Sequence, residues 1–292
     1  MNKQFNKGIL LTSLGSFWWG FIGVLYFEYV SFIGHIELVV HRCLWTAVML
    51  ILTTTIFSKW QIFLDIIKKK KILVSLFISG FLIFINWAVW IYAVATDRII
   101  DASFGYFIMP IISVLLGYIF FKEKLNQKRI ISIFLVFIAI LILLFFNLKN
   151  LPWVGLIVAL SWAFYNLIRK KINIDTDIGL LIESLYILPF ALICFYFISQ
   201  KGLNDFNSSN IGFSLFLILA GPMTVIPLFL YVRGVELIGL GPTGMIFYIT
   251  PTLQFILGYF YYNEDFSLVK FLSFIIIWIA VIIYLKDLYE TN

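Results

Sequence analysis

Ten long apolar runs constrain the fold of this chain more than any other feature of its sequence. Each run has about 20 residues, and at a rise of about 1.5 Å per residue that length crosses the roughly 30 Å hydrocarbon core of a bilayer. The runs are apolar at nearly every position and do not alternate with a period of two, so they favour membrane-spanning helices over a membrane barrel. They cover approximately residues 8–28, 36–57, 72–95, 99–121, 130–148, 152–168, 178–199, 211–232, 238–262 and 267–285.

The overall composition excludes a water-soluble domain. Hydrophobic residues make up 62% of the 292 residues and charged residues only 12%, and the mean hydropathy is +1.03. Polar side chains are therefore too few to cover a soluble surface. The first run is of spanning length and lacks a small-residue cleavage site, so we interpret it as the first helix and not as a signal peptide. We predict an all-α integral membrane protein with ten transmembrane helices.

A proline-centred segment, residues 99–123, recurs about 141 positions later in the chain. The recurrence matches Ile108, Pro110, Gly117, Tyr118 and Glu123 with Ile249, Pro251, Gly258, Tyr259 and Glu264, in that order. Ten helices then divide into five and five, and because five is odd the second half enters the membrane from the opposite side. We predict two inverted five-helix repeats, residues 1–148 and 149–292, within one membrane domain. Such repeats are typical of secondary transporters that alternate access to a site near the membrane midplane.

The basic residues predict the orientation of the chain. With the N-terminus in the cytoplasm, 16 of the 21 Lys and Arg residues fall on the cytoplasmic side, four (Arg98, Lys149, Lys201 and Lys270) fall outside, and Arg42 lies within a helix. By the positive-inside rule, both termini are cytoplasmic, in a bacterial inner membrane. The same bias accounts for the basic pI near 9.1 without nucleic-acid binding.

Known catalytic and metal-binding motifs are absent from the sequence. It has no P-loop, no His/Glu metal spacing and no Gly-x-Ser-x-Gly elbow, and its two cysteines, Cys43 and Cys194, lie inside apolar runs. We therefore expect no enzyme activity, no catalytic residues, no metal and no cofactor. A membrane-embedded enzyme would need a convergent set of reactive groups that this chain does not offer.

The second predicted helix is the most polar. Glu37, His41 and Trp45 recur every four residues on one face, and Arg42 is adjacent to that face. Ionisable groups inside a membrane are costly and mark transport pathways, so these residues are candidates for a substrate site. Glu37 lies close enough to the helix end to be simply solvated.

The seventh helix places Glu183 at the position that the repeat pairs with His41. We predict that the two side chains lie in one central cavity and act as proton-linked groups. The alternative is a structural ion pair between Glu183 and either Arg42 or Arg169.

The third helix combines an amide with indole rings. Asn86 and Trp90 share one face and Trp87 is adjacent, a combination that suits an amphipathic or cationic organic ligand. A role in helix packing is the alternative. We add, as residues of the same cavity or its surroundings, Trp18, Tyr106, Trp162, Tyr165, Arg169, Tyr248 and Gln254.

Pro110 and Pro251 each remove one backbone donor near the middle of a span, and Gly105 and Gly244 allow close approach of neighbouring helices. We predict that these four residues act as hinges of moving gates. The fifth and tenth helices have no polar stripe, so they are expected to form the outer scaffold or a dimer contact, in a monomer or a homodimer.

Six segments, in order, resemble the RarD branch of the EamA group within the drug/metabolite transporter superfamily. They are residues 37–45, 86–94, 102–110, 164–171, 179–183 and 248–253. The resemblance implies ten helices in two inverted repeats and transport of small metabolites or drugs, with export as the usual direction. Together with the polar residues above, it predicts a secondary transporter of a small amphipathic, amino-acid-like metabolite or drug, with protons as the coupling ion through His41 and Glu183. An importer or exchanger uses the same fold, and a non-transporting scaffold or receptor is the alternative of another class.

Overall fold

The computed structural model describes residues 3–30, 32–95, 99–147, 153–207, 210–261 and 268–291. Arg98, Lys149 and Glu264, which entered the predictions of orientation and repeat, lie outside these ranges, as does the predicted boundary at residues 148–149. The helices of the first half are α1 (Lys3–Phe17), the π-helix η1 (Trp18–Ile22), α2 (Gly23–Tyr29), α3 (His35–Ile56), α4 (Trp60–Ile67), α5 (Lys70–Ala95), α6 (Ile99–Phe121) and α7 (Gln127–Asn147).

The described residues of the second half are also mostly helical. Two of the predicted spans are broken into consecutive helices, one at Leu219 and one at Phe247 and Tyr248. The helices are α8 (Trp153–Ile172), α9 (Thr176–Gln200), α10 (Ile211–Ile218), α11 (Ala220–Ile238), α12 (Leu240–Ile246), α13 (Ile249–Phe260) and α14 (Leu268–Thr291).

Seven helical stretches of the described chain are long and apolar enough to cross a membrane. They are Lys3–Tyr29, His35–Ile56, Lys70–Ala93, Gln127–Phe146, Thr176–Gln200, Ile211–Ile238 and Leu268–Thr291. Gly105–Phe121 is a shorter apolar helix, α8 is more polar and ends in three basic residues, and α12 and α13 are separated by a turn. The prediction of an all-α multi-pass membrane protein is confirmed, and the count of ten crossings stays a prediction.

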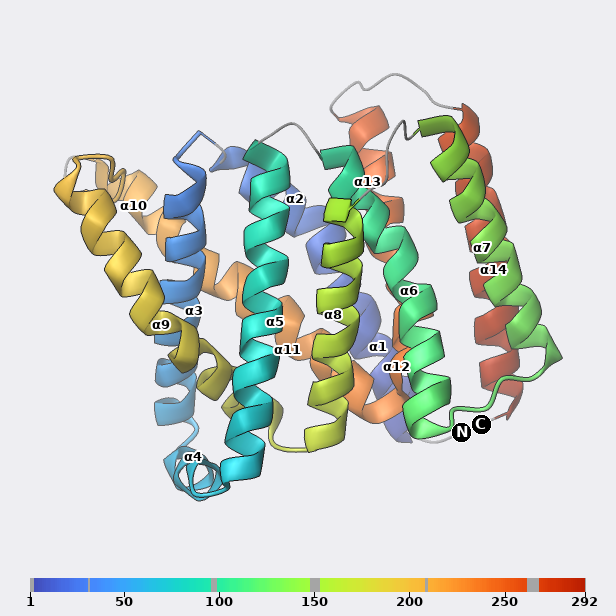
Figure 1. The fold of residues 1–292 in the computed structure, drawn as a ribbon, viewed down its shortest axis with the longest axis horizontal. Coiled ribbons are helices and arrows are strands. Elements are labelled where there is room, and N and C mark those ends of the chain that lie inside the picture. The colour runs from blue at the N-terminus through green and yellow to red at the C-terminus, as the bar shows by residue number, and fades with distance from the viewer. Residues whose placement is uncertain are drawn as a thin grey trace.

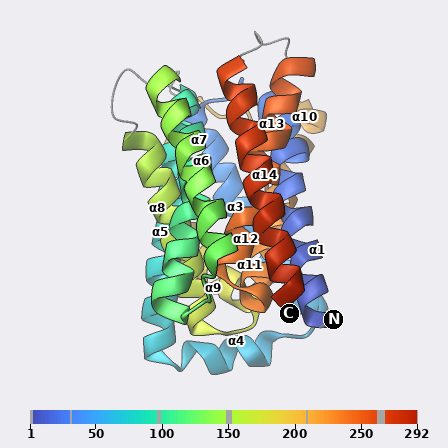
Figure 2. The ribbon, with the colours of Figure 1, turned by 90° about the vertical axis from the view of Figure 1, so that its right-hand side faces the viewer.

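The long helices stand side by side, and both termini lie at the same edge of the molecule (Figure 1). The short helix α4 lies across that edge, as the turned view shows (Figure 2). Helices α7 and α14 pack against each other at one end of the molecule (Figure 1), as the scaffold prediction for these two spans requires.

The two proline-containing spans meet near Pro110. A Cβ atom added to Gly244 of α12 would lie 2.9 Å from Ser113 Cβ and 3.1 Å from the Pro110 carbonyl oxygen of α6. One turn or more away, a Cβ on Gly105 would lie 2.5 Å from the Gly155 carbonyl oxygen of α8. Only glycine permits such close backbone contact, so α6 is tightly packed between helices of the other half.

Candidate functional site

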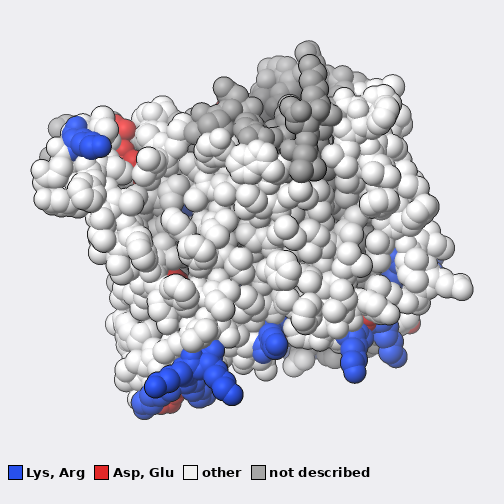
Figure 3. All heavy atoms as spheres, in the orientation of Figure 1, with Lys and Arg blue, Asp and Glu red and all other residues white. Residues whose placement is uncertain are grey.

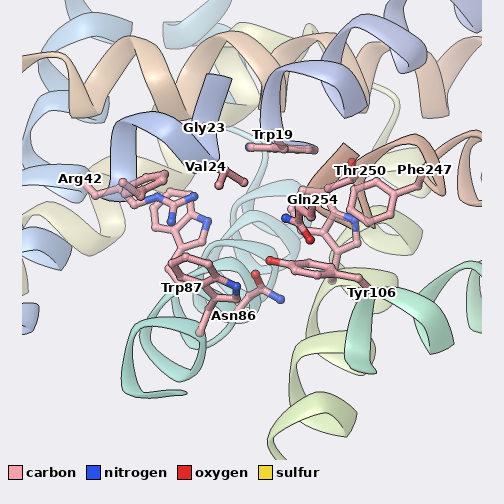
Figure 4. A pocket seen from close by; sticks show the side chains of 13 residues that line it. Trp19, Gly23, Val24, Arg42, Asn86, Trp87, Tyr106, Phe247, Thr250 and Gln254 are labelled. Atoms are coloured by element: carbon pink, nitrogen blue, oxygen red, sulfur yellow. The ribbon is translucent and has the colours of Figure 1, made fainter. Parts of the chain in front are cut away.

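A cleft with an empty volume of about 640 Å³, including the space at its mouth, lies between helices of both halves (Figure 4). The first half contributes η1, α2, α3, α5 and α6, and the second half contributes α8, α13 and the turn before α13. The residues that line this central pocket are Trp19, Gly23, Val24, Phe27, Arg42, Asn86, Trp87, Trp90, Tyr106, Trp162, Phe247, Thr250 and Gln254.

Aromatic rings close one end of the central pocket. The Trp19 ring centroid lies 5.1 Å from that of Trp162, 5.8 Å from that of Tyr231 and 6.2 Å from that of Phe247. On the far side of this cluster, Tyr165 stacks on Trp162 at 5.6 Å. Edge and tilted contacts of this kind are favourable beyond simple burial. We call this closely packed cluster of Trp19, Trp162, Tyr231 and Phe247 the aromatic floor of the pocket.

Trp19, and not the predicted Trp18, lines the pocket, and both residues lie in the π-helix. One turn of π-helix inserts a residue into the helical register and rotates the side chains that follow. The five-residue turn Trp18–Ile22 begins at this tryptophan pair, and Trp19 carries the contacts of the floor. A spacing of 3.6 residues read from the sequence does not reveal this shift.

Arg42 is the charged residue of the central pocket. It is only 7% exposed, and its guanidinium carbon lies 4.5 Å from the centroid of the Trp87 ring and 5.1 Å from that of Phe27. Its Nε donates a hydrogen bond of 3.1 Å to Thr224 Oγ1. Stacking and this hydrogen bond together fix the guanidinium at one end of the pocket (Figure 4).

Amide and hydroxyl groups lie away from Arg42. The Asn86 side chain donates hydrogen bonds of 2.9 Å to the Val158 carbonyl oxygen and 3.1 Å to Ser161 Oγ, which ties α5 to α8 and fixes the amide. Figure 4 shows Gln254 and Tyr106 pointing into the same space. The pocket therefore offers a cation at one end and neutral hydrogen-bonding groups further along an aromatic wall.

Seven of the eleven residues predicted for the substrate site line this pocket: Arg42, Asn86, Trp87, Trp90, Tyr106, Trp162 and Gln254. The other four, His41, Tyr165, Glu183 and Tyr248, do not, nor do the secondary candidates Trp18, Glu37, Trp45 and Arg169 or the predicted hinges Pro110, Pro251, Gly105 and Gly244. Sequence reasoning missed the lining residues Trp19, Gly23, Val24, Phe27, Phe247 and Thr250.

Glu37, His41 and Trp45 lie on one face of α3, as predicted, but they hold a loop in place. The Trp45 indole donates to His41 Nδ1 at 3.2 Å, so His41 Nε2 carries the proton that faces Glu37 Oε1 at 3.3 Å. The same Glu37 oxygen accepts hydrogen bonds from the backbone N–H groups of Asp205 (2.8 Å) and Phe206 (3.3 Å). These contacts hold the segment after α9 against α3.

Glu183 forms the structural ion pair that was left open as an alternative. Its Oε1 lies 3.7 Å from Arg169 Nη1 and accepts a hydrogen bond of 2.5 Å from Ser79 Oγ, and its Oε2 accepts one of 3.3 Å from Tyr165. The guanidinium of Arg169 lies directly against Gly179, where any Cβ would overlap it. The predicted meeting with the imidazole of α3 in one cavity is not observed, because each group already has its own partners.

A second, smaller and largely apolar space, with an empty volume of about 280 Å³ that includes open space at its edge, borders Glu183 and shares Trp87 with the central pocket. Trp87 thus separates the pocket from the ion pair. Of the other predicted residues, Tyr248 is buried and donates a hydrogen bond of 2.7 Å to the Phe107 carbonyl oxygen, so it links the start of α13 to α6.

Glu123, which follows α6, binds the N-terminus of α12. Its Oε1 accepts a hydrogen bond from the Leu240 N–H at 2.8 Å and its Oε2 accepts one from the Gly241 N–H at 2.9 Å, while Lys170 Nζ lies 3.8 Å away. A carboxylate satisfies the free N–H groups and complements the positive end of the helix dipole. The sequence singled out Glu123 as part of the repeat but gave it no role.

The described residues define the class as a multi-pass helical membrane protein with a pocket between its two halves. Comparison with known proteins makes this specific: a model of the EamA-like transporter family matches residues 6–145 and again residues 152–286. The chain belongs to the EamA-like transporter family. The resemblance predicted from six segments is thereby confirmed.

Known relatives and one solved structure are similar to this chain over most of its length. It is 32% identical to Protein RarD of Escherichia coli K12, over 99% of this chain and 97% of that protein, and 33% identical to the uncharacterized transporter YojE of Bacillus subtilis, over 97% and 95%. The chloramphenicol-sensitive protein RarD of Pseudomonas aeruginosa is 23% identical, over 85% and 83%. One crystal structure has a similar fold, with a TM-score of 0.70 at 13% identity over 95% of this chain and 96% of that chain.

Proposed function

We propose that the protein is a secondary active transporter that exports a small amphipathic metabolite or drug across the bacterial inner membrane by alternating access. Membership of the transporter family supplies the class, and the central pocket between helices of both halves is the observation that carries the mechanism. A non-transporting scaffold would pair its central polar residues with one another and leave no cavity. The cleft of about 640 Å³ favours transport.

We infer that the pocket opens to the side opposite the termini. Glu123 caps α12 at the edge of the molecule where the termini lie (Figure 1), whereas Phe27 and Trp90 line the pocket from the last two turns of α2 and α5, helices that run away from that edge (Figure 1). Loosening the cap and the floor while the opposite mouth narrows would expose the same pocket to the other side.

The packing pattern supports two inverted repeats. Helix α1 packs against α11, and its counterpart in the second half, α8, packs against α5; likewise α3 packs against α11, and α9 against α5. The pairs α3–α9, α6–α12 and α7–α14 join corresponding helices of the two halves. Figure 1 shows α1 and α8 running in opposite directions, and the family model matches twice.

The charge distribution supports cytoplasmic termini. Basic side chains gather along the edge of the visible face that corresponds to the termini (Figures 1 and 3), as the positive-inside rule requires for cytoplasmic loops. The proton-linked role of His41 and Glu183 stays a prediction. Since both lie outside the pocket, a change in the charge of Glu183 would act through Trp87, which borders both cavities.

A thermal-shift screen of amino acids, nucleoside-like metabolites and amphenicols, followed by transport of the stabilising compounds in proteoliposomes, tests the proposal. Uptake of these compounds into vesicles that contain the protein, and not into vesicles without it, is the expected result. A scaffold would bind none of them and would leave the vesicles impermeable. Accumulation in cells that express the protein, in place of depletion, would overturn the assigned direction.

Trp90→Leu is expected to weaken binding of the transported compound about tenfold, because loss of a stacked ring removes about 0.5–1.5 kcal/mol beyond its buried area. Trp153→Leu is the matched control, since Trp153 is 41% exposed near the start of α8 and does not line the pocket. The transport rate of the Trp153→Leu variant should stay within about twofold of the wild-type rate. Equal losses in both variants would place the substrate elsewhere.

A further inference from the structure

Among the thirteen residues that line the central pocket, Arg42 is the one with a charged side chain. It lies about 10 Å from the start of α3, seven residues in at about 1.5 Å each. A buried charge in a membrane protein is expensive unless it has a partner or faces water or a ligand. The charge of Arg42 must therefore be compensated by the surrounding protein, by water or by a ligand.

The described residues supply no counter-charge. No ion pair within the described ranges involves Arg42, and two buried acids of the membrane helices, Glu37 and Glu183, are engaged with His41 and with Arg169. The hydroxyl of Thr224 satisfies Nε alone. For both Nη atoms, the described part of the chain contains no hydrogen-bond acceptor.

The two rings that stack on the Arg42 guanidinium leave the edge of this group free to bind a ligand. Trp87 and Phe27 stack against it, and stacked rings occupy faces and not the in-plane N–H groups. The free Nη edge presents donors in the fork that a carboxylate matches with two parallel hydrogen bonds. Figure 4 shows Arg42 at the opposite end of the pocket from Phe247 and Tyr106.

The rest of the wall selects for an apolar body. The lining residues include the aromatic side chains of Trp19, Trp87, Trp90, Trp162 and Phe247, and rings of this kind pack against planar or aliphatic groups. We propose that the substrates are small organic anions, with a carboxylate held by Arg42 and a ring or apolar chain held by the indoles.

This assignment rests on the proposed transport function and narrows it. A cationic ligand, which Asn86 and Trp90 suggested from the sequence, would place a second positive charge in a pocket that already contains Arg42. Neutral amphipathic drugs would leave the guanidinium unpaired. Both therefore bind more weakly than an anion of the same shape.

Matched triads of compounds test the head-group preference of the pure wild-type protein. In one triad, 3-phenylpropionate, 3-phenylpropionamide and 3-phenylpropylamine share a body and differ in charge, and indole-3-acetate with its amide and tryptamine gives a larger body. Binding is followed by quenching of tryptophan fluorescence and by thermal shift. The carboxylate of each triad is expected to bind about 10- to 100-fold more tightly than its amide, as one charge-assisted interaction allows.

Variants tie the preference to Arg42. Arg42→Gln should abolish the difference between carboxylate and amide, and Arg42→Lys should retain part of it because the charge stays but the fork is lost. Thr224→Ala should weaken carboxylate binding about threefold to tenfold, and Thr224→Ser should restore it. Arg233→Gln, which removes an arginine outside the pocket, should leave the preference unchanged.

The outcomes separate this inference from the transport proposal. Tighter binding of amides or amines, or an unchanged preference in Arg42→Gln, overturns the anion assignment while transport of those ligands would still stand. Absence of saturable binding by every carboxylate also overturns it. Should Arg42→Gln fail to fold, the triads on wild type and the Thr224 variants still decide the question.

Discussion

Glu183→Gln is expected to lower the free energy of unfolding by about 3–5 kcal/mol, because it leaves the guanidinium of Arg169 buried without its counter-ion. The side chains of Arg169 and Glu183 are 0% and 2% exposed, and within the described chain Nε and Nη1 of the arginine have no hydrogen-bond partner. The carboxylate is therefore the main compensation for this charge. Thermal unfolding of the purified protein in detergent measures the loss.

Removal of both charges provides the internal control. Arg169→Met combined with Glu183→Gln should be more stable than Glu183→Gln alone, since an apolar replacement of a buried ion pair is often neutral. Glu290→Gln is the matched surface control. Glu290 pairs with Lys128 at 2.7 Å, and their side chains are 46% and 57% exposed. Solvent screens this pair, so Glu290→Gln should leave the unfolding temperature nearly unchanged. Equal losses for Glu183→Gln and Glu290→Gln would refute a structural pair.

The double variant also separates the two roles considered for Glu183. A purely structural pair predicts that the double variant recovers transport together with stability. A proton-linked carboxylate predicts recovery of stability while transport stays lost or loses its pH dependence.

Glu123→Ala is expected to open the termini side of the pocket. It removes two charge-assisted hydrogen bonds to the α12 N-terminus, each worth about 1.5–3 kcal/mol, so the closed arrangement should lose at least about 3 kcal/mol, or roughly 100-fold in its equilibrium. Hydrogen exchange by mass spectrometry should show faster exchange in the peptide that contains Leu240 and Gly241, and transport should fall at least about tenfold.

Two control variants accompany Glu123→Ala. One keeps a carboxylate at position 123, and the other removes a carboxylate that does not contact α12. Glu123→Asp retains the carboxylate at shorter reach and should lie between wild type and Glu123→Ala, and Glu290→Ala should leave exchange in α12 unchanged. Transport and exchange at wild-type levels in Glu123→Ala would show that the cap does not control access.

The spans could be predicted from the sequence because hydropathy alone reports where a helix enters lipid. Arg42, Asn86 and Trp87 were also predictable, since a polar residue inside a membrane span must turn away from lipid. Phe27 and Phe247 were not, because nothing in the sequence separates two pocket phenylalanines from the other 30. Pocket phenylalanines are identified only by the packing of distant helices.

The partners of the buried charged side chains could not be predicted from the sequence either. Sequence placed His41 and Glu183 correctly as buried polar groups, but a pseudo-symmetric match does not say which side chain each one meets. Glu37, Trp45 and Arg169 are the partners in the structure, and this choice depends on tertiary packing. Similarly, the sequence does not show that a π-helix begins at Trp18.

Side-specific thiol labelling tests alternating access to the central pocket most directly. Val24→Cys, in a chain whose two native cysteines are replaced by alanine, places a thiol on the pocket wall, and Leu141→Cys on the exposed face of α7 is the lipid-facing control. A membrane-impermeant maleimide is added to right-side-out and to inside-out vesicles. We expect Val24→Cys to react from the side opposite the termini without substrate, and from the termini side when substrate is transported or Glu123 is replaced by Ala. Reaction from one side alone under all these conditions would contradict the account.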